Sequence, residues 1–166
     1  MSNVQKKRNI VLSVFVLLLG IVLAASCEHT NDSGQQNCGE TNNSSAGSSK
    51  SHNIGQNCMN CHSPGGSGKG CFDVGGTAHT DETGDQTISE GVVRLYTQPD
   101  GGGELRATIP VDAKGNFYTT DAIDFSGGVY PSAAGPSGSE MFMSSKITAG
   151  QCNSCHGKST DALWAQ

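Results

Sequence analysis

One five-residue pattern, Cys-x-x-Cys-His, occurs twice in the chain, at 58–62 and again at 152–156. With this composition, chance would produce the pattern on the order of 0.01 times, and a pair on the order of 10⁻⁴ times. The spacing serves covalent attachment of c-type haem, because two cysteines on one helical turn reach the two vinyl groups and the next histidine reaches the iron. The sequence therefore predicts two haem c groups, attached through Cys58, Cys61, Cys152 and Cys155, with His62 and His156 as proximal iron ligands.

Two other kinds of site use paired cysteines. A zinc site built from both Cys-x-x-Cys pairs leaves the histidine after each pair unexplained. A redox-active dithiol of the thioredoxin kind needs a βαβ pattern around it, which this sequence lacks, and free thiols oxidise in an exported protein. Covalent haem is the interpretation that accounts for all six residues.

Residues 1–26 have the pattern of an export signal. Lys6, Lys7 and Arg8 precede an apolar run from residue 10 to residue 23, and small residues lead to Cys27. The run is shorter than the roughly 20 apolar residues of a membrane span. The segment resembles a bacterial lipoprotein signal, which implies lipidation of Cys27 as the new N-terminus; an ordinary signal peptide is the alternative. We expect an exported lipoprotein at the outer membrane, on its periplasmic or cell-surface side.

Residues 27–51 are dominated by Ser, Asn and Gly, and we expect a flexible tether there. Without the leader, seven Lys and Arg remain of ten against fifteen Asp and Glu, a formal charge of −8. This balance excludes a basic nucleic-acid binder and favours basic partners or metal cations. We expect the partners to be redox proteins or other cytochromes. Cys38 and Cys71 are the even remainder of the cysteines, and in an oxidising compartment we expect them to form a disulfide.

Between the motifs, residues 71–148 read as β-structure. Strands are expected near 71–80, 91–97, 105–111 and 117–120, with looser ones near 128–130 and 140–147. The stretch 75–121, with its D-x-x-G-N-F-Y turn at 112–118, resembles the carboxypeptidase-regulatory or transthyretin-like family. The resemblance implies a small, mainly β, antiparallel Ig/transthyretin-like sandwich. Short haem-binding segments at 52–70 and 149–166 are expected to flank it.

Each iron needs a sixth ligand or an open face. His52 lies six residues before Cys58, so we expect it on the first haem, with a solvated tether residue as the alternative. His79 ends the first expected strand; with an odd number of strands it meets the second haem. Met141 and Met143 have strand spacing, which favours core packing over ligation. An odd count also predicts haems at opposite ends of the sandwich, and so end-to-end self-association for electron transfer.

With two haem motifs around a sandwich, the chain resembles small c-type cytochrome lipoproteins of metal-reducing and related anaerobic bacteria. The resemblance implies a membrane-anchored electron carrier in periplasmic or extracellular respiration rather than an enzyme. No Ser/His/Asp set, phosphate loop or zinc signature accompanies the motifs. The alternatives are a dihaem enzyme, a peroxidase or small-molecule reductase with one open iron, and an adhesion module in which haem is incidental.

Overall fold

A computed structural model describes residues 38–166 of the chain. The predicted signal peptide at 1–26, the predicted lipidation at Cys27 and the first part of the predicted tether, 27–37, lie outside the described residues. Over the part that is described, no helix has both the length and the apolar character to cross a membrane.

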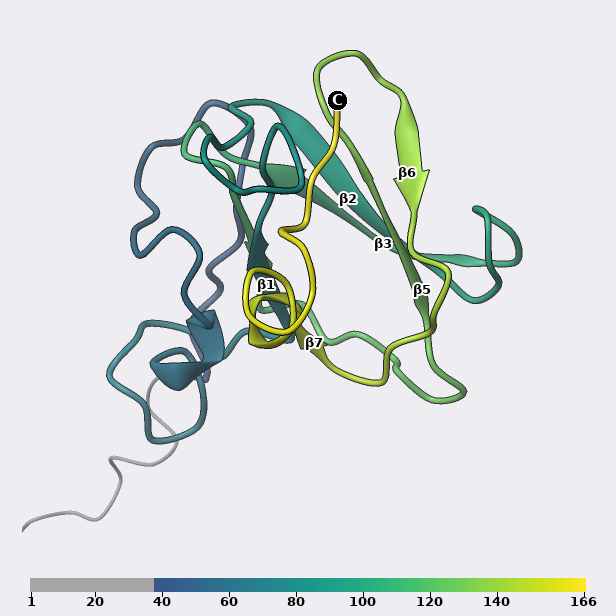
Figure 1. The fold of residues 1–166 in the computed structure, drawn as a ribbon. Coiled ribbons are helices and arrows are strands. Elements are labelled where there is room, and N and C mark those ends of the chain that lie inside the picture. Colours follow the sequence, from purple (N-terminus) through teal and green to yellow (C-terminus); the bar gives the residue numbers. More distant parts are fainter. Residues whose placement is uncertain (1–37) are drawn as a thin grey trace, which may run out of the picture. The chain divides into compact units, whose positions relative to one another are not determined.

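Seven strands form two sheets (Figure 1). The three-stranded sheet has the order β4-β1-β7 and the four-stranded sheet the order β3-β2-β5-β6. The strand bounds are β1 Val74–Thr77, β2 Gly91–Tyr96, β3 Leu105–Val111, β4 Asn116–Thr119, β5 Tyr130–Ala134, β6 Glu140–Phe142 and β7 Gly150–Gln151. The only helical elements among residues 38–166 are two single 3₁₀ turns, η1 Cys58–Asn60 and η2 Cys152–Ser154. The prediction of a mainly β fold is confirmed.

The core lies between the sheets and follows from alternation along the strands. In β2, Val93 and Leu95 are buried and their neighbours are half-exposed. In β3, Ile109 and Val111 are buried in the same way. Phe117 of β4 has the largest side chain among those with no more than 2% exposure. The expected strands at 91–97, 105–111 and 117–120 therefore match β2, β3 and β4 within one residue.

β7 departs from the expected all-antiparallel arrangement. It lies inside the segment predicted only to carry the second haem motif, and it pairs in parallel with β1, Val74 against Gly150 and Gly75 against Gln151. Two parallel strands need a long connection between them. Here the connection from β1 to β7 contains all the other strands of the domain. Because η2 begins at the residue after β7, this pairing carries the second Cys-x-x-Cys-His motif directly to β1.

The flexible-tether prediction for 27–51 is wrong for the part that the structure describes. Residues 42–51 run along the domain: Ser44 N donates to Tyr118 O (2.8 Å), and the buried Ser51 accepts from Asn116 Nδ2 at Oγ (2.9 Å). Asn43 Oδ1 accepts from Thr120 N (2.8 Å). The composition indicated disorder because the segment has little apolar area; its polar side chains instead bind the free backbone groups of β4.

The last residues of the chain also pack on the domain. His79 N donates to Leu163 O (2.8 Å) and Ala165 N donates to His79 O (3.0 Å), so the chain end continues the hydrogen bonding beyond β1. Gly135 N donates to Gln166 O (3.1 Å). Ala165 has no exposed surface. The second motif is therefore anchored on both sides, by β7 before it and by this C-terminal segment after it.

Candidate haem-attachment site

Both Cys-x-x-Cys-His motifs fold alike. Each begins with one 3₁₀ turn, and each histidine N–H donates to the carbonyl of its first cysteine: His62 N to Cys58 O at 2.9 Å and His156 N to Cys152 O at 3.0 Å. The turn places two cysteines and a histidine on one short coil. In both motifs the second cysteine, Cys61 or Cys155, is exposed and the first is half-buried.

The two first cysteines lie against consecutive residues of β1. A Cβ atom added at Gly75 would lie 3.2 Å from Cys58 Cβ, and one added at Gly76 would lie 2.9 Å from Cys152 Cβ. Consecutive residues of a strand face opposite sides of its sheet, so η1 and η2 approach β1 from its two faces. Gly75 and Gly76 are needed because any larger side chain would hold these turns away from the strand.

The two attachment turns are also bonded to each other. Asn153 of η2 donates from Nδ2 to Gln56 O (2.9 Å), just before η1, and accepts from Thr77 N at Oδ1 (3.1 Å). Asn57, the N-cap of η1, donates from Nδ2 to Gln151 Oε1 (3.2 Å). Asn153 is buried. Satisfied buried amides of this kind fix the relative position of the segments that carry them.

The prediction that the two motifs lie at opposite ends of the sandwich is wrong. The strand count is odd, as expected, but β7 pairs in parallel with β1 and η1 packs on the same strand. The sequence argument assumed that the first motif sits where the first strand begins and the second where the last strand ends. Both instead meet the middle of β1, and the geometric reason for end-to-end self-association disappears.

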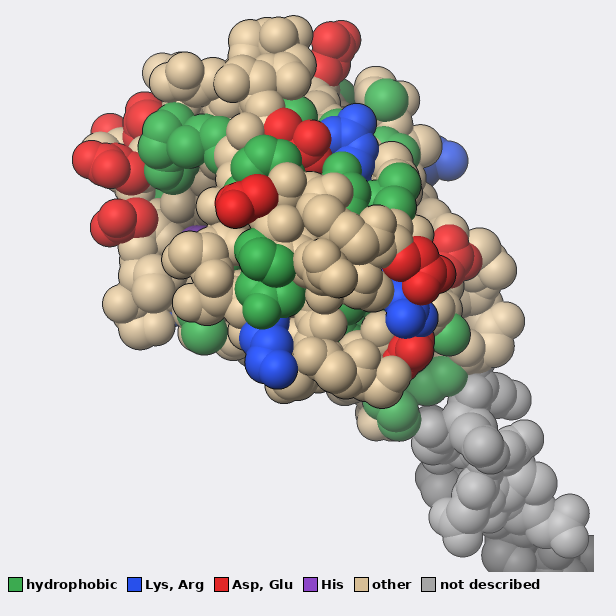
Figure 2. All heavy atoms as spheres, turned by 90° about the vertical axis from the view of Figure 1, so that its right-hand side faces the viewer, with side chains coloured by type: hydrophobic (Ala, Val, Ile, Leu, Met, Phe, Trp, Pro, Cys, Tyr) green, Lys and Arg blue, Asp and Glu red, His purple; other side chains and the backbone are tan. Residues whose placement is uncertain are grey.

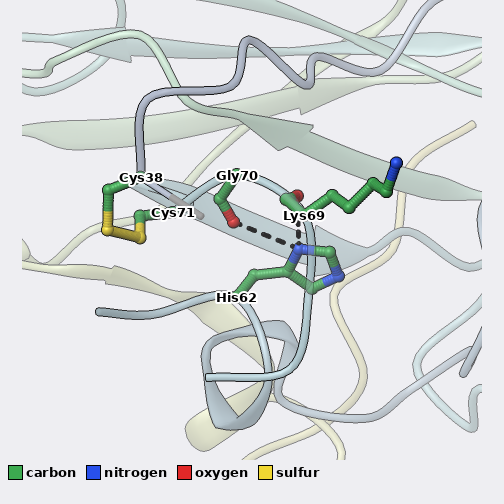
Figure 3. Close-up of a disulfide and its surroundings, with 5 residues drawn as sticks. All are labelled: Cys38, His62, Lys69, Gly70 and Cys71. Atoms are coloured by element: carbon green, nitrogen blue, oxygen red, sulfur yellow. Dashed lines mark hydrogen bonds between the residues drawn. A yellow bond between two sulfur atoms is a disulfide. The ribbon is translucent and has the colours of Figure 1, made fainter. Parts of the chain in front are cut away.

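The two motif histidines share one arrangement of hydrogen bonds. His62 Nδ1 lies 2.9 Å from Lys69 O and 3.3 Å from Gly70 O (Figure 3), and His156 Nδ1 lies 3.0 Å from Asp161 O. A carbonyl oxygen can only accept, so Nδ1 carries the proton in both rings. The lone pair is then on Nε2, the nitrogen that binds a metal. Both rings are therefore preset as Nε2 ligands.

A cavity of about 570 Å³ adjoins the first motif. Its size falls within the range of about 300–1,000 Å³ that small-molecule and cofactor sites occupy. The imidazoles of His52 and His62 both line it, with ring centroids 6.0 Å apart. Two imidazoles that each place Nε2 about 2 Å from a shared metal have centroids about 6 Å apart, which is the spacing of this pair. Cys58, Cys61, Phe72 and Tyr118 also line the cavity, and most of its other lining residues are polar, such as Asn43, Ser51 and Asn116.

A second cavity, of about 280 Å³, adjoins the second motif between the inner face of the β5–β6 edge and the C-terminal segment. His156 lines it, and so do Met141 and Met143, which stand two residues apart and so face the same side of the sheet. The remaining wall is mostly apolar and includes Leu163 and Trp164. Sequence spacing favoured core packing for these methionines, but both are only partly buried and border an open space.

His79 is buried, it bridges to Thr87 and to Trp164, and it is not among the residues that line the cavity at His156. The C-terminal segment pairs with its backbone, an element that the strand pattern does not reveal. Among residues 38–166, His79 Nδ1 is one of three buried side-chain atoms without a hydrogen-bond partner. The structure supports a packing residue here.

Burial makes the first cysteine of each motif a poor thiolate. Burial raises the pKa of Cys152 to about 12, with a further contribution from nearby Cys58, whose own pKa is also raised by burial. Redox-active Cys-x-x-Cys sites have the opposite property, a lowered pKa at the attacking cysteine. The environment of both turns therefore disfavours the dithiol hypothesis.

Cys38 and Cys71 form a disulfide, with Cα atoms 4.5 Å apart (Figure 3). This is the pair that the cysteine count predicts. Within the described range 38–166 there is no group of three or more His, Cys, Asp or Glu side chains arranged to hold a metal ion.

Sequence reasoning missed the residues that hold the motifs together: Gly75, Gly76, Asn153 and the carbonyls of Lys69 and Gly70. A Gly-Gly pair inside a strand was an available signal, since glycine in a strand often marks close approach of another backbone. Comparison with protein-family models, with curated proteins and with solved structures found no match for this chain.

Proposed function

We propose that this protein is a membrane-anchored dihaem c-type cytochrome that transfers electrons in periplasmic or extracellular respiration. The observation that carries the proposal is that both Cys-x-x-Cys-His histidines have Nδ1 held by a backbone carbonyl, which leaves Nε2 for iron. Each also borders a cavity. The proposed scaffold is a transthyretin-like sandwich, and the proposed anchor is lipid on Cys27 at the outer membrane.

Covalently bound haem supplies a reversible one-electron Fe(III)/Fe(II) couple. Cys58 and Cys61 hold one group with His62 as proximal ligand; Cys152 and Cys155 hold the other with His156. His52 is the proposed sixth ligand at the first iron, on the ring spacing of 6.0 Å. The wall of the cavity at His156 is mostly apolar, whereas polar side chains make up most of the wall of the cavity at His62. The short, hydrogen-bonded link between η1 and η2 would give a direct route between the two sites.

The proposed partners are redox proteins with basic docking surfaces. On the face seen in Figure 2, acidic side chains lie at the left and right and also near the middle, with Lys and Arg side chains beside several of them, and hydrophobic side chains form separate small groups. An acidic surface raises the encounter rate with a basic partner. Asp81 and Asp124 are exposed, and hydrogen bonds to Thr83 and to Ser126 lower the pKa of the respective carboxyl. Asp124 is also paired with Arg106 at 2.9 Å.

The attachment of haem is tested first by mass. Expressed with a c-type maturation system, the protein is expected to carry two covalent haems, and Cys58→Ala/Cys61→Ala or Cys152→Ala/Cys155→Ala to carry one each. Cys38→Ala/Cys71→Ala is expected to keep both haems, since these two cysteines lie outside both motifs. A protein that matures without covalent haem would overturn the proposal.

For the second iron we propose Met143 as sixth ligand in place of His79. Met141 faces buried Ala133 across the β5–β6 ladder, whereas Met143 follows the end of β6, on the side from which the chain continues to β7 and η2 (Figure 1). Met143→Ala should abolish the near-infrared methionine-to-iron charge-transfer band of the ferric protein and lower the potential of that haem. Met141→Ala and His79→Ala should keep the band. Its loss in Met141→Ala alone, or its absence from the unmutated protein, contradicts this assignment.

The dihaem-enzyme hypothesis makes a different spectroscopic prediction. An enzyme needs one iron with an open face, which gives a high-spin ferric signal in electron paramagnetic resonance (EPR). The electron-carrier proposal requires both irons to be low-spin. The cavity at His156 has Met141 and Met143 in its wall rather than acid–base side chains facing the histidine, apart from the exposed Asp161. This lining favours the carrier.

A further inference from the structure

We propose that Asn42 and the Cys38–Cys71 disulfide are a positioning device for His62, and that they set the redox potential of the first haem independently of the second. This inference rests on the proposed cytochrome function. It concerns a part of the chain, residues 38–43, that carries no haem motif. Five observations on the contacts of His62 and His156 support it.

Asn42 and His62 meet at the same acceptor. Lys69 O accepts from Asn42 Nδ2 at 2.7 Å and lies 2.9 Å from His62 Nδ1. Asn42 N in turn donates to Thr120 Oγ1 at 3.0 Å, which ties this residue to the end of β4. The carbonyl that holds the proximal histidine is therefore itself held in place by Asn42, through a chain of bonds that begins in the sheet.

The disulfide fixes the second acceptor. Gly70 O lies 3.3 Å from His62 Nδ1, and Gly70 is bonded covalently to Cys71 (Figure 3). Gly70 has a φ of +75°, and a Cβ atom there would lie 2.9 Å from Glu40 O and 3.0 Å from Asn42 Cβ. The loop is thus pressed against residues 40–42, and the disulfide prevents the two segments from separating.

The same loop encloses the imidazole ring. A Cβ atom at Gly68 would lie 2.7 Å from the Cγ and Nδ1 atoms of His62, so position 68 passes directly beside the ring. Phe72 stacks on the ring at 4.0 Å with an interplanar angle of 7°, and its N–H donates to His62 O at 3.0 Å. His62 is only 7% exposed, so its orientation depends on this loop.

His156 has the same motif without this support. Its Nδ1 lies 3.0 Å from Asp161 O and 3.5 Å from Thr160 Oγ1, both in an exposed turn. Residues 157–161 contain no cysteine and so are closed by no disulfide. Asp161 O accepts from Gly157 N (3.3 Å) within its own turn, but among residues 38–166 no distant side-chain amide or disulfide holds it. The molecule therefore provides its own comparison: two motif histidines with equal local folds, of which only His62 has an acceptor tied to a distant segment by an amide and a disulfide.

The expected direction follows from ligand chemistry. An Nδ1–H that donates to a carbonyl makes the imidazole a stronger electron donor, which stabilises ferric iron and lowers the potential. If the acceptor becomes mobile, the bond weakens and the potential rises. The net free energy of one such hydrogen bond corresponds to a change on the order of fivefold in an equilibrium constant. Its complete loss would therefore change the Fe(III)/Fe(II) ratio at a fixed applied potential by this factor.

The experiment is a potentiometric titration followed by EPR on the dihaem protein and three variants. Asn42→Ala removes the amide at Lys69 O, and Cys38→Ala/Cys71→Ala removes the disulfide. Asn43→Ala is the matched control, since Asn43 ties the same segment to Thr120 but does not touch Lys69 or Gly70. The signal that changes in His52→Ala identifies the first haem.

We expect the potential of the first haem to rise in Asn42→Ala and in the double-cysteine variant, with the second haem and the Asn43→Ala protein unchanged. Three results would overturn the inference: equal shifts in the potentials of both haems, no shift of the first potential in Asn42→Ala, or a fall of that potential. A fall would show that Asn42 competes with His62 for the carbonyl. Haem content by mass separates these results from failure of the proposed function: a protein without haem refutes the cytochrome, whereas two haems with unshifted potentials refute only the positioning role.

Discussion

Gly76→Ala is expected to destabilise the domain and to reduce haem attachment at the second motif in one step. The added Cβ would lie 2.6 Å from Phe117 Cζ and 2.9 Å from Cys152 Cβ. Phe117 has no exposed surface and belongs to the core, so its ring has little room to move. Overpacking of this kind costs about 1–3 kcal/mol in the free energy of unfolding. If η2 moved away to relieve the clash, the second Cys-x-x-Cys-His turn would be displaced.

The comparison within β1 sharpens this test. Gly75→Ala would meet Cys58 at 3.2 Å, a milder contact, and should disturb the first motif rather than the core. Gly39→Ala is the control, because no heavy atom lies within 4 Å of its added Cβ. Denaturant unfolding and haem stoichiometry measure the two effects. If Gly76→Ala were as stable and as fully loaded as Gly39→Ala, the close approach of η2 to β1 would be refuted.

A strand could be predicted from the sequence where buried and exposed residues alternate along it. A strand that forms only because another strand is available to pair with it could not be predicted. β3, with Ile109 and Val111 buried and Pro110 between them half-exposed, has the period of two that identifies a half-buried strand. β7 is two residues long, Gly150 and Gln151, and exists only because β1 offers an edge. A segment this short shows no periodicity, so β7 could not be predicted. Because β7 was missed, its parallel pairing with β1 and the adjacency of the two motifs were missed as well.

The candidate site divides in the same way. The cysteines and histidines of the two Cys-x-x-Cys-His motifs are contiguous in sequence, so their spacing alone is enough to predict a role for them. Their supports come from distant segments: Asn42 reaches Lys69 O across 27 residues and Asn153 reaches Gln56 O across 97. Asparagine in a polar stretch has the composition of a linker, and only the folded backbone shows that these amides have specific acceptors.

The two irons of the holoprotein are expected to interact electrostatically and magnetically within one molecule. Cys58 and Cys152 lie against neighbouring residues of β1, and the side chain of Asn153 bonds to the backbone at Gln56. In the proposed dihaem protein, both haems would therefore be held at adjacent points of the fold. Because like charges repel, reduction of one iron should make reduction of the other harder.

Single-haem proteins measure this interaction directly. In Cys152→Ala/Cys155→Ala the remaining haem should titrate as one independent centre, at a potential different from that of the same haem in the dihaem protein. Its ferric EPR signal should lose the broadening and the fast relaxation that a neighbouring paramagnetic iron causes. Dilution is the control, because an interaction between molecules weakens with concentration and one within a molecule does not. Identical potentials and line shapes in the one-haem and two-haem proteins would place the porphyrins far apart despite their adjacent attachment turns, and electron transfer would then require contact between molecules.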